Sequence, residues 1–152
     1  MNELKRIFIE GTAKAPQIDF HPLSGELILS GKSIPENAAK IYEPLLFWIT
    51  DYIKSPKHTT NLRINLEYFN TATSLWIVKI IKELSKIEIE DSVLVIHVYL
   101  DIEDLESMDI EELKDLVWSL IGNVLHSKVS IGIKIYGTDN EGKILRESTV
   151  II

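Results

Sequence analysis

The stretch 92–100, SVLVIHVYL, constrains the fold most, because it is a nearly continuous apolar run rich in β-branched residues. Such a run is typical of a strand that is covered on both faces, as in a parallel sheet. Amphipathic helical patterns lie on either side of it, at 71–85 and at 109–125. The inward stripe predicted for 71–85 consists of Ala72, Trp76, Ile77, Ile80, Ile81 and Leu84. A buried strand between two helices predicts βαβ crossovers, which are right-handed and place parallel strands in one sheet.

The other segments extend this pattern to the order β-β-β-α-β-α-β-α-β-β. The expected strands are 6–12, 17–21, 26–33, 62–69, 92–100, 129–137 and 143–152, and the first helix is expected at 33–54. Small loops separate the first three strands, which predicts an antiparallel start to the sheet. We therefore expect one α/β domain over 1–152, with a mixed β-sheet and crossover helices packed mainly on one face.

The first helix carries two local signals. Ser33 and Glu36 have the spacing of a capping box, and Pro35 suits the first turn of a helix. Pro44 lies inside the apolar pattern, where the missing N–H predicts a kink or two shorter helices that meet there.

The composition limits the kind of protein this can be. A formal charge of −7 over 152 residues argues against non-specific nucleic-acid binding, which requires a basic surface. The chain has no cysteine, which excludes disulfide and thiolate chemistry and suits a reducing compartment. Neither a signal peptide nor an apolar run of the ~18 residues needed for a membrane span is present. We expect a cytoplasmic protein that binds neither nucleic acid nor membrane.

Common catalytic signatures are absent from the sequence. There is no phosphate-binding glycine loop, and no histidines fall at metal-ligand spacing, so we expect no catalytic residue, metal or cofactor. His97, inside the apolar strand, is interpreted as a structural histidine. Asp101, Glu103 and Asp104 follow that strand and are interpreted as a solvated helix start, at a sheet edge that also suits partner binding. The alternative is a small enzyme or ligand- or metal-binding domain that uses the carboxylates near Asp101–Asp104 with His97.

The junction LEYFNTATSLW, 66–76, is the most informative segment for function. A strand ends there, a helix begins at once, and three hydroxyl residues lie at the boundary: Thr71, Thr73 and Ser74. Either Asn70 or Thr71 can serve as the N-cap, which stabilises a helix by about 1 kcal/mol. A second interpretation is that one hydroxyl is phosphorylated, because free N–H groups and the helix dipole tolerate a phosphate there. The two interpretations are compatible, since one threonine can cap the helix when unmodified and switch the surface when modified. The residues alone do not choose between the three.

Four segments carry a family resemblance: IEGTAKAPQIDFHPLSGELILSGKS, SIPENAAKIYEPLLFWITDYI, LRINLEYFNTATS and VYLDIEDLESM. Together they resemble the SiaC family of bacterial regulatory phosphoproteins, whose fold is similar to the STAS domains of anti-sigma-factor antagonists. The resemblance covers about residues 6–112 and leaves the C-terminal helix and β-hairpin, 113–152, without a counterpart.

The resemblance implies a non-enzymatic signalling protein of the partner-switching kind. In this family a dedicated serine/threonine kinase phosphorylates the threonine of the Tyr-Phe-Asn-Thr block, and a PP2C-type phosphatase removes the phosphate. The unphosphorylated form binds and activates a diguanylate cyclase, which places the family in c-di-GMP signalling.

Matched residue by residue, the resemblance assigns the phosphosite to Thr71. A serine run usually follows that threonine in the family, whereas Ala72 follows it here. The residues expected to bind the partner are Pro35, Glu36, Asn37, Tyr68, Phe69, Asn70, Thr73, Ser74, Asp101, Glu103 and Asp104.

Overall fold

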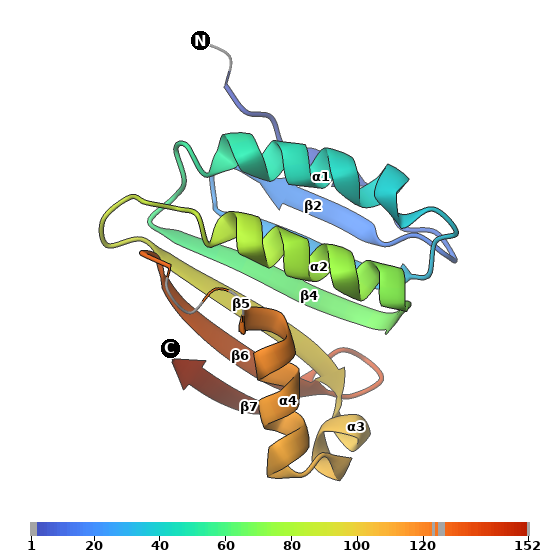
Figure 1. Ribbon diagram of the computed structural model, residues 1–152. Helices are drawn as coiled ribbons and strands as arrows, with labels where there is room; N and C mark the ends of the chain where they lie inside the picture. Colours follow the sequence, from blue (N-terminus) through green and yellow to red (C-terminus); the bar gives the residue numbers. More distant parts are fainter. Residues whose placement is uncertain (1–2, 123, 125–126, 152) are drawn as a thin grey trace.

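A single mixed β-sheet runs through the chain, and its strands follow one another in sequence order (Figure 1). The computed structural model describes residues 3–122, 124 and 127–151, so positions 123 and 125 of the third predicted helix and position 152 of the last predicted strand lie outside the described residues. The elements in the described part are β1 (Ile7–Ile9), β2 (Gln17–His21), β3 (Glu26–Ser33), α1 (Ala38–Tyr52), β4 (Thr59–Phe69), α2 (Thr71–Leu84), β5 (Val93–Asp101), α3 (Ile102–Ser107), α4 (Ile110–Ile121), β6 (Ser130–Thr138) and β7 (Ile144–Ile151).

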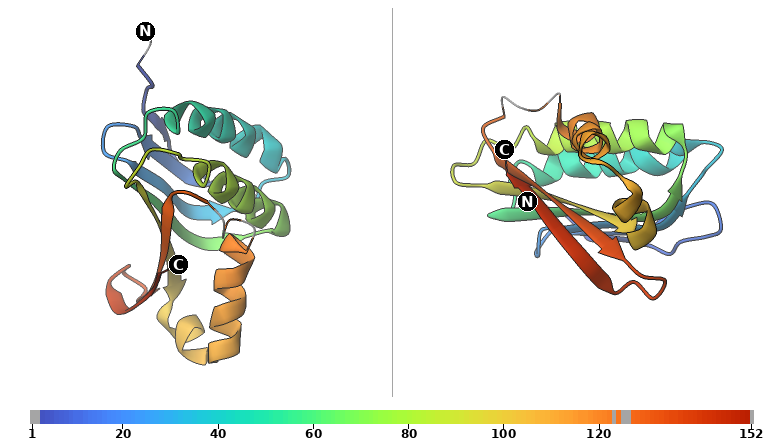
Figure 2. Two further views of the ribbon diagram at one scale, coloured as in Figure 1. Left: turned by 60° about the vertical axis from the view of Figure 1, so that its left-hand side comes forward. Right: turned by 90° about the horizontal axis from the view of Figure 1, so that it is seen from below.

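The sheet opens and closes with antiparallel pairs and is parallel in between. Strands β1, β2 and β3 pair antiparallel, β3 to β6 are parallel, and β7 returns antiparallel to β6. Each crossover leads to the next strand in the same direction, so right-handed connections place every helix on the same face. Figure 2 shows the helices on that one side of the sheet. The predicted α/β class, the mixed sheet and its antiparallel start are confirmed.

The hydrophobic core lies between this layer of helices and the sheet. Its strand side consists of alternate residues such as Leu62 and Ile96, both fully buried. Its helix side includes Trp48 of α1, whose ring lies 5.4 Å from that of Phe20 and stacks on Tyr52. None of the helices in the described part of the chain is long and apolar enough to cross a bilayer.

The opposite face of the sheet carries polar side chains, and no helix within the described part of the chain covers it. Arg63 of β4 forms a two-pronged ion pair with Glu26 of β3 and donates to Tyr99 of β5. The expectation that 92–100 is covered on both faces is therefore wrong: among the described residues, helices cover only one face of β5. The apolar composition suggested cover on both faces because it includes Val95, which lies on the face without helices and is half-buried by neighbouring residues of the sheet alone.

The predicted capping box at the first helix is also wrong. Ser33 is the last residue of β3, fully buried, and α1 begins five residues later at Ala38, after an N-cap, Asn37, whose side chain makes no capping bond. Glu36 instead lies 3.8 Å from Lys14. The Ser33 hydroxyl is used by the interior, as described below, and is not available to a helix start.

Pro44 does not divide the first helix, because α1 runs through it without interruption. The hydrogen bond that Pro44 cannot make would go to the carbonyl of Lys40, one turn earlier. Both residues lie on the exposed side of α1, where water can bind that carbonyl. The expectation of two shorter helices is therefore wrong.

A short helix that the sequence pattern did not predict, α3, follows β5 directly. Its N-cap is Asp101, and two acidic residues lie in its first turn. The next helix, α4, begins with a complete capping box between Asp109 and Glu112. The acidic segment therefore forms two capped helix starts rather than one.

Two glycines offer a matched test of the turn that joins β2 to β3. Gly25 and Gly31 both have positive φ, but a Cβ at Gly25 would lie 2.5 Å from the backbone oxygen of Thr59, whereas a Cβ at Gly31 would meet nothing within 4 Å. We expect Gly31→Ala to cost about 1–2 kcal/mol of unfolding free energy from backbone strain alone. Gly25→Ala should cost clearly more in urea unfolding, and equal costs would contradict the close approach.

Candidate functional site

The predicted site residues gather at one edge of the sheet, where the parallel strands end. Ser33, Phe69 and Asp101 are the last residues of β3, β4 and β5. Carboxyl ends of parallel strands share an edge, and α/β sheets commonly place their binding sites there. Ser33 pairs directly with Phe69 in the ladder, which brings the Pro-Glu-Asn block next to the Tyr-Phe-Asn-Thr block.

Asn70 holds this edge together with three hydrogen bonds. Its side-chain oxygen accepts from the backbone N–H of Thr73 at 2.9 Å, which makes Asn70 the N-cap of α2. Its side-chain amide donates to the carbonyl of Pro35 at 3.2 Å, and its backbone N–H donates to the carbonyl of Ser33. Of the two candidate caps, the structure selects Asn70 over Thr71.

Thr71 is the first residue of α2 and is exposed. Its carbonyl accepts a hydrogen bond from the Ser74 hydroxyl at 2.7 Å, but its own hydroxyl bonds to no other described residue. The idea that one threonine both caps the helix and carries the phosphate is therefore wrong in its first half. Thr71 has an accessible hydroxyl, and the helix keeps its cap whatever happens to that hydroxyl.

Thr73, expected on the partner surface, is fully buried. Its hydroxyl donates to the carbonyl of Ser33 at 2.9 Å and lies 2.8 Å from the Ser33 hydroxyl, which in turn lies 2.6 Å from that of Tyr42. Burial raises the pKa of Tyr42, so this phenol stays protonated as a hydrogen-bonding group. The structure removes Thr73 from the partner surface and gives it a structural role.

The residues around Thr71 present an apolar and partly aromatic surface. Tyr68 is 63% exposed and Phe69 is 50% exposed, although both belong to the strand β4. Glu36 and Asn37 are exposed beside them, in the loop that the Asn70 amide holds through Pro35. Large exposed aromatic side chains that lie close together are typical of a protein-binding surface.

The carboxylates after β5 act on the helix that follows them. The Asp101 side chain accepts from the backbone N–H of Glu103 at 2.9 Å and caps α3. Glu103 and Asp104 lie exposed in the first turn, where negative charge complements the helix dipole.

His97 lies away from these carboxylates and close to neutral groups. Its two ring nitrogens lie 2.7 Å from the Tyr136 hydroxyl and 2.8 Å from the side-chain oxygen of Asn61. Burial, assisted by the nearby charge of Arg63, lowers the pKa of His97 to about 4, so the ring is neutral at physiological pH. Among the described residues, no group of three or more His, Asp or Glu side chains is arranged to hold a metal ion. This geometry does not favour the alternative of an enzyme or metal site.

A groove beside Thr71 is a feature that the sequence did not predict. Strands β4 and β5 pair only as far as Ile64 and Val98, although β4 continues to Phe69 and β5 to Asp101. Between the separated strand ends, α2 and α4 leave an apolar groove of about 360 Å³. Its wall residues include Leu75 and Val78. Both are apolar but lie outside the inward stripe predicted for α2, and they are the sequence feature that could have indicated this groove.

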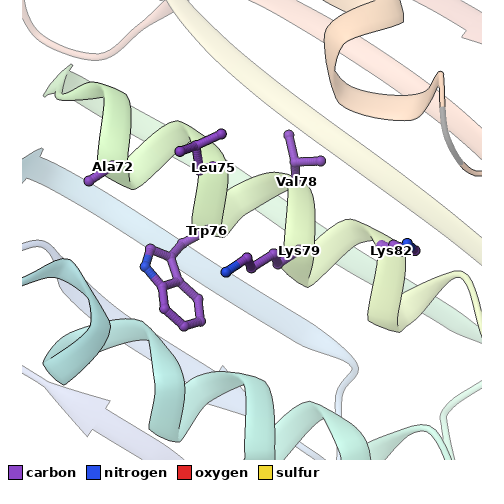
Figure 3. Close-up of a pocket in the computed structure, with 6 residues that line it drawn as sticks. All are labelled: Ala72, Leu75, Trp76, Val78, Lys79 and Lys82. Carbon is purple, nitrogen blue, oxygen red and sulfur yellow. The ribbon is translucent and has the colours of Figure 1, made fainter.

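The exposed side of α2 is shown in Figure 3. Leu75 and Val78 point to one side of the helix, whereas Trp76 points toward α1, where it stacks on Tyr42. The Lys79 ammonium lies 4.3 Å from the centre of the Trp76 ring. The two sides of α2 therefore differ: Trp76 packs against α1, and the Leu75 side lines the groove.

The fold and the site define a mixed α/β protein with an exposed threonine at a capped helix start. The sequence profile described as "SiaC family regulatory phosphoprotein" matches residues 9–121. The chain therefore belongs to the SiaC family. This match extends beyond the resemblance seen over 6–112 and includes all of α4.

Solved structures of SiaC from Pseudomonas aeruginosa share the fold. Apo-SiaC is 21% identical with a TM-score of 0.62, covering 73% of this chain and 92% of that chain. A second structure contains the diguanylate cyclase SiaD in complex with its activator SiaC. It is 18% identical to this chain, with a TM-score of 0.66. That match covers 86% of this chain and 99% of the other. A search of curated proteins finds no significant sequence match.

The buried hydroxyls can be tested by removing one of them without changing its shape. Thr73→Val deletes the donor to the Ser33 carbonyl and leaves buried polar groups unpaired, so we expect a loss of about 1–3 kcal/mol in unfolding free energy. The control is Thr71→Val on the exposed turn of the same helix, which should change stability by less than about 0.5 kcal/mol. Chemical denaturation of both variants measures the two changes in stability. A Thr73→Val protein as stable as wild type would contradict the buried hydrogen-bond network of Thr73, Ser33 and Tyr42.

The low pKa of His97 predicts that stability falls as the pH is lowered. Unfolding raises the pKa from about 4 toward the usual 6.5, so the unfolded chain binds more protons at intermediate pH. Between pH 7 and pH 5 this difference should cost about 2 kcal/mol of unfolding free energy. Urea unfolding at both pH values should show a smaller loss in His97→Gln, whereas His58→Gln, at an exposed histidine, should keep the wild-type loss. An unchanged loss in His97→Gln would refute the assignment.

Proposed function

We propose that this protein is a non-enzymatic signalling switch that binds and regulates a diguanylate cyclase in its unphosphorylated form. A serine/threonine kinase modifies Thr71, and a PP2C-type phosphatase restores the free hydroxyl. The observation that carries the proposal is the exposed hydroxyl of Thr71, which bonds to no other described residue, beside a cap supplied independently by Asn70.

A phosphate on Thr71 would change the surface without opening the fold. The first turn of a helix offers free N–H groups and the positive end of the dipole, both favourable to an anion. The modification adds a charge of about −2 at pH 7. Because Asn70 keeps capping α2, the unmodified and modified forms differ mainly in what they present to a partner.

The family supports regulation by phosphorylation, and the solved complex supports the class of partner. The family to which this chain belongs is one of regulatory phosphoproteins. A SiaC with the same fold occurs in complex with a diguanylate cyclase that it activates. Such a role requires a binding surface and no catalytic residue.

The partner surface in this proposal consists of the exposed residues around Thr71. Tyr68 and Phe69 supply apolar contact area, and Glu36 and Asn37 supply polar contacts at its margin. Asn70 fixes the position of Pro35 through its side-chain amide, and Ser74 donates to the carbonyl of Thr71. The carboxylates of Asp101, Glu103 and Asp104, at the start of α3, extend the same sheet edge.

The switch is tested by comparing Thr71→Ala with Thr71→Glu. We expect the Ala variant to bind a diguanylate cyclase from the same host like wild type and to raise its rate of c-di-GMP formation. The Glu variant should bind at least about tenfold more weakly, which corresponds to about 1.4 kcal/mol. Titration calorimetry and cyclase assays measure both effects, with Thr149→Glu, at an exposed threonine on β7, as the control.

Phosphopeptide mapping of protein from its native host supplies an independent readout. The phosphate should map to Thr71 and should disappear in Thr71→Ala. A Thr71→Glu variant that binds and activates the cyclase as well as wild type would contradict the proposal. A phosphate located only on Ser74 would also contradict it.

A further inference from the structure

The sheet ends on one side in a long strand with a free edge. β7 pairs with β6 along one side, and no described residue pairs with its other side (Figure 1). Such a strand presents backbone N–H and C=O groups that are ready to pair with another chain, so proteins usually shorten, bend or charge their edge strands. The outer side of β7 is therefore a candidate interface between chains.

The two edges of the sheet differ in how well they are protected. β1, at the opposite edge, has three residues, whereas β7 has eight. The register shift between β6 and β7 lies at Gly137 and Thr138, beside the start of β7, so the pairing beyond it is regular. Residues 144–151 include neither proline nor lysine, which commonly block an edge. Only the short edge is thus protected against further pairing.

Apolar side chains lie exposed next to this long edge. Ile144 and Leu145 of β7 are 47% and 53% exposed. On α4, Ile110 and Trp118 are 67% and 62% exposed, and neither lines the groove on the α2 side of that helix. The strand order places β7 beyond α4 on the side away from α2. Apolar contact area beside β7 is therefore available to add to backbone pairing.

Symmetry favours a second copy of this chain as the occupant of the edge. An edge strand can pair antiparallel with its own copy across a two-fold axis, and such a contact closes at a dimer. The other contact between copies, β7 of one against β1 of the next, would repeat without closing and build a filament. With three residues, β1 is too short to pair along β7. The contact of β7 with β7 is the one that closes.

We propose that this protein forms a dimer by antiparallel pairing of β7 with β7 of a second copy, with the two-fold axis at Ser148. Residues directly opposite in a sheet share a face, so the axis passes through a residue. An axis at Arg146 or Glu147 would oppose that charge to itself, which is unfavourable. The axis at Ser148 places Glu147 opposite Thr149 of the second copy and joins residues 145–151, the longest ladder without opposed like charges.

This interface is separate from the proposed switch. Thr71 follows β4, and β5 and β6 lie between β4 and β7 in the sheet. Glu147 lies 3.5 Å from Lys134 of its own chain, so its charge is already balanced. The family profile ends at residue 121, before β6 and β7, so the edge lies outside the part of the chain that the profile matches. The dimer does not depend on the proposed function.

A charge placed on β7 tests both the pairing and its register. Wild-type protein should sediment at high concentration with twice the mass of one chain and dissociate on dilution. In Thr149→Glu the new carboxylate lies opposite Glu147 of the second copy, twice by symmetry, and should raise the dimer dissociation constant at least about fivefold. Within its own chain it lies opposite Lys134, so the fold should not be weakened. The control is Gln17→Glu, at an exposed position of the inner strand β2, which should dimerise like wild type.

A single introduced thiol locates the two-fold axis. The chain has no cysteine, so Ser148→Cys contains one thiol per chain. In the proposed dimer the two Cβ atoms at this position lie about 4.5–5.5 Å apart, within reach of a short bismaleimide that should join the chains covalently. Glu141→Cys, in the turn before β7, should give no covalent dimer because the two turns lie at opposite ends of the paired strands.

Wild-type protein that remains monomeric at its highest soluble concentration would overturn the proposal. So would a Thr149→Glu protein that dimerises as tightly as wild type, or cross-linking through Glu141→Cys but not through Ser148→Cys. Cyclase binding is a separate readout: a monomeric Thr149→Glu that still binds the cyclase supports both proposals. A wild-type dimer that binds no cyclase would leave the β7 interface standing and refute the proposed function.

Discussion

The functional edge depends on the hydrogen bonds of the Asn70 side chain. With its oxygen it caps α2, and with its amide it holds the loop after β3 through the carbonyl of Pro35. Beneath it, the hydroxyls of Ser33, Thr73 and Tyr42 bond to one another in the interior. Two blocks more than thirty residues apart are thereby held in one arrangement. The exposed residues above them are free to serve recognition because they are not needed to hold the fold together.

The order of the strands explains why this edge is accessible. Each crossover moves to the adjacent strand in the same direction, so the helices share one face and the carboxyl ends of β3 to β6 share one edge. Where β4 and β5 stop pairing, after Ile64 and Val98, that edge opens into the apolar groove. Regular pairing thus builds the body of the sheet, and its interruption creates the hollow.

Much of the fold could be predicted from the sequence, because hydrophobic periodicity reports which face of an element is buried. It placed β2 and β3 correctly, and the antiparallel start with them. It failed where a polar side chain had two possible uses: Ser33 looks like a helix cap but supplies a buried hydroxyl. Periodicity also could not show that Val95 lies on a face without helices, since half-burial between strands selects the same residue types.

For the candidate site, the sequence could name the junction but could not assign its residues. The family resemblance chose Thr71, and the structure shows that hydroxyl to be exposed, whereas that of Thr73 is buried. Neither the separation of β4 from β5 nor the groove could be predicted, because both depend on contacts between elements distant in the chain. Only the apolar residues Leu75 and Val78, off the inward stripe of α2, indicated that a second surface exists.

The burial of Thr73 has a consequence for the fidelity of any enzyme that modifies this junction. Three hydroxyl side chains lie within four residues, a spacing over which a kinase that reads only an extended segment would discriminate poorly. In the folded protein Thr73 is buried, and Ser74 is half-buried and donates to the carbonyl of Thr71. A kinase that acts on the native state therefore finds only the Thr71 hydroxyl fully exposed among these three. If the junction is modified as proposed, the choice of site would be made by the tertiary structure of the substrate, and modification of Thr73 would report unfolding at this helix start.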